Sequence, residues 1–92
     1  MAMSETTVKA PASGVSADAL FQMGLRLSTP GQEGVEVDPV AALALFDMAA
    51  RSGSIEAKIY RRELSDEMNP DDVLESRRLV REWLGSIEPV QR

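Results

Sequence analysis

The chain has few bulky side chains with which to build a core. Only four of its 92 residues are aromatic, Phe21, Phe46, Tyr60 and Trp83, although 43% of the residues are hydrophobic. The core must therefore consist mainly of Ala, Leu, Val and Met, which favours closely packed helices over β-sandwiches. A length of 92 residues also limits the chain to one domain.

Capping and turn residues mark the boundaries of two expected helices in the first half of the chain. Ser16 is a candidate N-cap, and apolar residues recur at helical spacing from there to Ser28, where Thr29-Pro30-Gly31 forms a turn. Asp38-Pro39 predicts the start of a second helix, since Asp accepts hydrogen bonds from free backbone N–H groups and Pro fits the first helical position. Gly53 is expected to end that helix in a left-handed conformation.

Two further helices are expected in the second half. Ser54 begins a third helix, and Asn69-Pro70 repeats the cap-and-proline signal at the start of a fourth, which is predicted to end near Leu84 because Gly85 follows. The predicted fold class is therefore all-α, with two antiparallel helical hairpins. The expected segments are a flexible N-terminal arm (residues 1–15), two hairpins (16–54 and 55–86) and a C-terminal tail (87–92).

One face of each expected helix carries the candidate core residues. In chain order these are Leu20, Met23, Gly24 and Leu27; Ala42, Leu45, Phe46, Ala49 and Ala50; Ala57, Tyr60, Leu64 and Met68; and Val73, Val80, Trp83 and Leu84. Several of these side chains are small, so neighbouring helices are able to pack at short interaxial distance. Packing in the core is also the favoured role for Trp83, with ligand binding as the alternative.

The first hairpin resembles the Sel1-like repeat family. The residues that carry the resemblance are Ala19, Met23-Gly24, Gly31, Gly34-Val35, Asp38, Ala42, Leu45-Phe46, Ala49-Ala50, Gly53 and Ala57. The chain departs from the family pattern at Leu27, where Tyr is preferred, and at Arg61-Arg62, where a second repeat has Leu-Gly. The resemblance implies one full repeat followed by a degenerate C-terminal capping hairpin, in a short α–α solenoid like those of tetratricopeptide repeats. It also implies a role in protein–protein scaffolding.

Composition argues against several classes of function. The chain has no Cys and no His, which removes thiolate zinc sites, thiol catalysis and the commonest general base, so neither an enzyme nor a cofactor-binding protein is expected. A net charge of −5 argues against nucleic acid as a partner. No apolar run is long enough to insert in a membrane and no signal sequence is evident, so a cytoplasmic protein is expected.

Acidic residues gather in two places, around Asp71, Asp72 and Glu75 and around Glu33, Glu36 and Asp38. Carboxylates near the first turn of a helix usually interact with its dipole, and neither cluster has the ligand spacing of an EF-hand. A role in capping is therefore favoured over a metal site.

Two sets of residues are candidates for contact with a partner. Phe21 and Leu25 lie four residues apart, beside the buried face of the first helix, and no earlier repeat is expected to cover them. Either the N-terminal arm folds back over this strip through Val8 or Val15, or the strip is a binding or self-association surface. The sequence alone does not separate these alternatives.

The second candidate is a short basic turn of the third helix, formed by Lys58, Arg61 and Arg62, beside the acidic run Glu63, Asp66 and Glu67. An internally ion-paired, solvated helix face is favoured here over a phosphate site. The predicted function is a small protein–protein interaction module or adaptor, with a protein partner or a second copy of the chain. The alternative is an obligate small structural subunit of a larger assembly.

Overall fold

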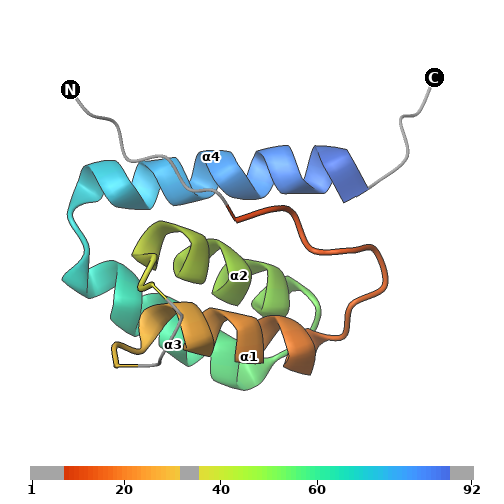
Figure 1. The fold of residues 1–92 in the computed structure, drawn as a ribbon, viewed down its shortest axis with the longest axis horizontal. Helices are drawn as coiled ribbons and strands as arrows, with labels where there is room; N and C mark the ends of the chain where they lie inside the picture. Colours follow the sequence, from red (N-terminus) through yellow and green to blue (C-terminus); the bar gives the residue numbers. More distant parts are fainter. Residues whose placement is uncertain (1–7, 32–35, 88–92) are drawn as a thin grey trace.

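The computed structural model describes residues 8–31 and 36–87, which form four α-helices (Figure 1). The helices are α1 (Ala17–Ser28), α2 (Pro39–Arg51), α3 (Ile55–Glu67) and α4 (Pro70–Ile87). No strand occurs in these two ranges. The fold is all-α with four helices, as predicted. The expectations for Glu33, Gly34, Val35 and the outermost residues of the arm and the tail lie outside the described residues.

Local hydrogen bonds explain why each helix begins where it does. In all four cases a side-chain oxygen accepts a hydrogen bond from the backbone N–H three residues later. The capping residues are Ser16, Asp38, Ser54 and Asn69, with distances of 3.0, 3.1, 3.0 and 3.0 Å. The four predicted helix starts are therefore confirmed.

The predicted end of the fourth helix was wrong. α4 continues through Gly85 to Ile87, and Gly85 does not adopt a positive φ, unlike Gly53, which has φ of +112° after α2. A glycine ends a helix only where the chain must turn. Within a helix it costs about 1 kcal/mol relative to Ala. Packing of the preceding turn through the buried Trp83 holds the backbone in helical conformation at this point.

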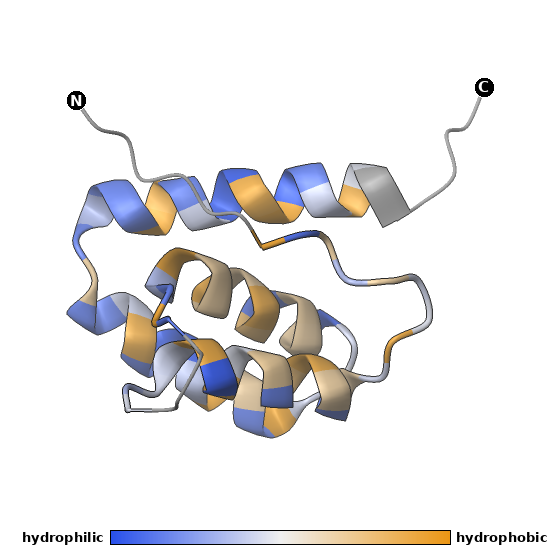
Figure 2. Cartoon of the chain, in the orientation of Figure 1, coloured by the Kyte–Doolittle hydropathy of each residue, from blue (hydrophilic) through white to orange (hydrophobic). Residues whose placement is uncertain are grey.

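The second helix is the centre of the fold. α2 packs against α1, α3 and α4, whereas α3 and α4 hardly approach each other. Ten of its 13 residues are buried, so the predicted stripe of five underestimates its contacts. Figure 2 shows that α2 is apolar along most of its length, while α3 and α4 carry hydrophilic residues. α3 and α4 are therefore joined by a short connection but splayed around α2.

The first hairpin depends on a close approach between α1 and α2. A Cβ atom at Gly24 would lie 2.6 and 2.7 Å from two ring carbons of Phe46 and 3.3 Å from the carbonyl oxygen of Ala42. Ala42 and Ala49 are completely buried. The predicted close approach of the two helices is confirmed at Gly24 and Ala42.

Phe21 lies in the core, which corrects the prediction of an uncovered strip on the first helix. Its ring centroid is 5.8 Å from that of Phe46 and 5.1 Å from that of Tyr60, and only 6% of Phe21 is exposed. Leu25 is half-buried and packs against the same core. Phe21 is buried because α3 places Tyr60 beside it. The periodicity of the first helix alone does not predict this contact.

The N-terminal segment also covers the core. Val8, Ala10 and Val15 pack against it, and Pro11 is buried. In Figure 1 this segment, coloured red, passes from beside α4 to the start of α1. Residues 8–15 are therefore part of the folded unit, while coverage of the Phe21 and Leu25 strip by this arm stays a prediction.

Candidate functional site

A groove of about 830 Å³ lies between α3 and α4, with α2 as its floor. It exists because both helices pack on α2 without packing on each other. The lining residues come from all three helices: Leu43, Asp47 and Arg51 of α2; Lys58, Arg61, Arg62 and Ser65 of α3; and Val73, Ser76, Arg77, Val80, Arg81 and Leu84 of α4.

The lining residues follow helical spacing, so each wall of the groove is one continuous helix face. On α3 the positions differ by three or four residues, from Lys58 to Arg61 or Arg62 and on to Ser65. On α4 the same spacing connects Val73, through Arg77 and Val80, to Leu84. Side chains three or four residues apart are neighbours on a helix surface. The walls are therefore preformed by regular secondary structure.

Two of the three buried residues in the lining are apolar. Leu43 and Val80 are buried, and Val73 and Leu84 are half-buried along the wall formed by α4. Ser76 is the exception, a polar residue that is only 2% exposed. Apolar side chains combined with a few polar groups are typical of ligand-binding concavities.

The walls are strongly cationic. Six of the ten basic residues of the chain line this groove, although the chain as a whole has a net charge of −5. Asp47 is the single acidic residue in the lining. Its carboxylate accepts hydrogen bonds from Arg61 at 2.6 Å and from Arg51 at 3.3 Å. The groove therefore concentrates positive charge on an acidic protein.

Four of the six groove cations are not neutralised in this way. Within residues 8–31 and 36–87, Lys58, Arg62, Arg77 and Arg81 form no ion pair. All four residues are exposed, whereas the side chain of Arg61 is held against α2 by Asp47. Their charges are available to an anionic ligand.

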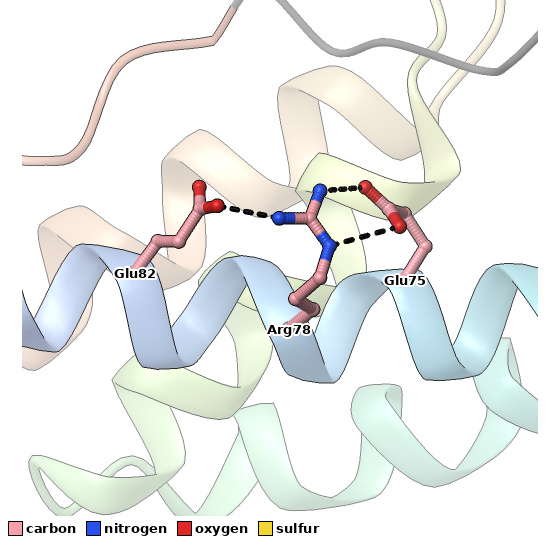
Figure 3. Close-up of polar contacts among 3 residues, drawn as sticks. All are labelled: Glu75, Arg78 and Glu82. Carbon is pink, nitrogen blue, oxygen red and sulfur yellow. Dashed lines mark hydrogen bonds and ion pairs between the residues drawn. The ribbon is translucent and has the colours of Figure 1, made fainter.

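A third arginine of α4 is paired and lies outside the groove. Arg78 donates hydrogen bonds to the carboxylates of Glu75 and Glu82, one helical turn away on either side (Figure 3). The hydrogen bond from Arg78 lowers the pKa of Glu75, and the same hydrogen bond raises the pKa of Arg78. On α4, Arg78 is therefore neutralised outside the groove. Arg77 and Arg81 line the groove and form no ion pair within the described residues.

The structure brings one predicted set of site residues together in the groove and places the other set elsewhere. Lys58, Arg61 and Arg62 all line the groove, while Phe21 is in the core and Leu25 does not line the groove. The expected ion pairs between the basic turn and the acidic run of α3 do not form among the described residues. Arg61 pairs with α2 instead, because packing of α3 on α2 places Asp47 within reach.

Sequence reasoning missed the contributions of Arg51, Arg77 and Arg81. The i,i+4 spacing of Arg77 and Arg81 matches that of Lys58 and Arg62, and this shared spacing was the available signal. It did not reveal that the two pairs lie on facing helices, because that depends on the angles at which α3 and α4 cross α2.

The described residues offer little support for two other kinds of site. They contain no group of three or more acidic side chains placed to hold a metal ion. Asp72, from one of the acidic clusters, accepts a hydrogen bond from the side chain of the capping residue Asn69. None of the helices in the described ranges has the length and apolar character needed to cross a membrane.

Comparison with protein-family models, with curated proteins and with solved structures found no match. The resemblance to Sel1-like repeats therefore stays a prediction, as does a solenoid arrangement.

Proposed function

We propose that this protein is a non-catalytic protein–protein interaction module whose binding site is the groove between α3 and α4. The observation that carries the proposal is the combination of apolar side chains from α2 and α4 with four wall cations that form no ion pair within the described residues. Such a surface stabilises a bound segment by burial of apolar area and selects it by charge. The absence of His and Cys from the chain supports a binding role over a catalytic one.

Selection from a random peptide display library tests the proposal without knowledge of the natural partner. Peptides enriched on the wild-type protein should lose binding to the variant Arg81→Glu, which reverses one charge in the groove. Binding to Arg26→Glu should be unchanged, since Arg26 is an exposed residue at the far end of α1 and the net charge changes equally. Failure to enrich any peptide, or equal binding to both variants, would contradict the proposal.

An obligate subunit of a larger assembly is the second candidate. Ile55 and Ile59 occupy neighbouring turns of α3 and are 72% and 54% exposed, which favours a permanent apolar contact. A module that folds alone should be monomeric and unfold cooperatively, whereas an obligate subunit should associate or unfold at low concentration. Sedimentation equilibrium, combined with thermal unfolding at several protein concentrations, distinguishes the two.

A further inference from the structure

The shape of the groove limits the kind of segment that fits. Along α4 its lining extends from Val73 to Leu84. At a rise of 1.5 Å per residue this is about 16 Å, or three helical turns. The opposite wall is also a helix, and α2 contributes lining residues between the two walls, so helices bound the groove on three sides. A short helix packs well against such surfaces, because its side chains fit between the ridges of neighbouring helices.

The apolar and charged side chains of the groove follow a regular pattern along its length. Leu43, Val80 and Leu84 lie along the groove, with Lys58 and Arg62 on the α3 side and Arg77 and Arg81 on the α4 side. Each cation pair is spaced by four residues, which is one helical turn. A helix with a central apolar stripe and acidic residues on both flanks of that stripe complements all of these groups at once.

Nucleic acid fits the same surface poorly. A phosphate backbone would leave the apolar side chains of the groove without a complementary partner, and stacking of bases requires aromatic side chains that the groove lining does not contain. These features favour an acidic protein segment over another polyanion.

We propose that the groove binds an acidic amphipathic helix of a partner protein, about three turns long, with aliphatic side chains against Leu43, Val80 and Leu84 and carboxylates against the four cations that have no ion pair within the described residues. This inference rests on the proposed function, which requires only that the groove bind some protein segment. It specifies the chemistry and conformation of that segment.

Three synthetic peptides of equal composition and length test the helical and amphipathic character. The first has Leu residues at helical spacing flanked by Glu, with Ala elsewhere and one Pro at its N-terminus. The second has the Leu positions shuffled so that no stripe exists, and the third has the Pro moved to its centre. Fluorescence anisotropy should show that the first peptide binds at least about tenfold more tightly than the others, equivalent to about 1.4 kcal/mol. Circular dichroism should show that it gains helix on binding.

Two matched pairs of protein variants locate the binding. Arg81→Glu should weaken the first peptide at least about tenfold, while Arg26→Glu should not. Val73→Asp, in the groove, should weaken it in the same way, while Leu74→Asp should not, since Leu74 is 60% exposed and does not line the groove. Thermal unfolding of all four variants verifies that each remains folded.

The outcomes separate this inference from the proposed function. Equal binding of the centrally Pro-substituted peptide, still lost in Arg81→Glu, would overturn the helical occupant but leave the groove as a peptide site. Selection of non-acidic peptides that depend on Arg81 would overturn the acidic occupant alone. Tighter groove-dependent binding of a short DNA duplex or of polyphosphate than of the first peptide would overturn the protein partner. If every peptide binds the groove variants as tightly as it binds the wild-type protein, both proposals are contradicted.

Discussion

Gly24 shows how one side chain sets the distance between two helices. The ring of Phe46 occupies the space that a Cβ atom at position 24 would fill, so α1 and α2 approach closely at this point. Gly85, in α4, has nothing within 4 Å of the corresponding position. The two glycines therefore have different physical roles although both are helical.

Substitution by alanine should reveal this difference. Gly24→Ala should destabilise the protein by about 1 to 3 kcal/mol, because overpacking against Phe46 outweighs the gain in helix propensity. Gly85→Ala should stabilise it by up to about 1 kcal/mol, since only the propensity term applies. Urea unfolding measures both changes. Equal effects of the two substitutions would show that the α1–α2 contact is looser than the structure has it.

The paired Glu75 and Arg78 provide a second test at single residues. The pKa of Glu75 is lowered by its hydrogen bond from Arg78, so its contribution to stability is present above the unfolded pKa of about 4.3 and is lost as the pH falls through the lower, folded value. An NMR titration should show this lowered pKa in the wild type and a higher one in Arg78→Gln. An unchanged pKa in the variant would contradict the role of Arg78. Both residues are solvated, so the effect on overall stability is expected to be small.

Among the elements, α2 is held at its N-terminal end as well as along its faces. At its N-terminus, Asp38 links the two helices of the first hairpin. Its side chain accepts the backbone N–H of Ala41, and its own backbone N–H donates to the carbonyl of Leu27 at 2.9 Å. The cap therefore orients the chain where it enters the central helix.

Removal of this cap should destabilise the whole domain. Asp38→Ala is expected to cost about 1 kcal/mol, which lowers the melting temperature of a domain of this size by about 4 to 8 °C. Asp38→Asn keeps an oxygen that accepts the hydrogen bond and should change stability by only a few tenths of a kcal/mol, by the ranking of N-cap residues. Thermal unfolding compares the two variants. If they are equally destabilised, the negative charge rather than the hydrogen bond is responsible.

For the whole molecule, the N-terminal segment and the groove are both consequences of the central position of α2. Val8, Ala10 and Val15 pack against the core that α2 organises. The space between α3 and α4 remains open as the groove. The N-terminal segment therefore completes the core, while the groove between α3 and α4 is left open for a partner.

The contribution of this segment can be measured with the same substitution at two nearby alanines. Ala10 packs against the core, whereas Ala12 is exposed. Ala10→Asp should destabilise the protein by about 1 to 3 kcal/mol because a charge is placed at a partly buried position. Ala12→Asp should have little effect. Hydrogen exchange and thermal unfolding measure the difference, and equal stability of the variants would indicate that residues 8–15 act as a free arm.

Local sequence was sufficient for the helix starts and for the small residues at the first hairpin. Ser16, Asp38, Ser54 and Asn69 act through hydrogen bonds to a backbone group only three residues away, so their role can be read from the chain directly. The all-α class follows from the same signals together with the apolar periodicity.

Tertiary structure alone decided the burial of Phe21, the partner of Arg61 and the composition of the groove. Each of these depends on residues distant in sequence, as when α3 brings Tyr60 to Phe21 and Arg61 to Asp47. Arg77 and Arg81 face Lys58 and Arg62 because two helices cross α2 at angles set by side-chain packing. Periodicity along one helix places a residue on a face, but it carries no information about which helix that face meets.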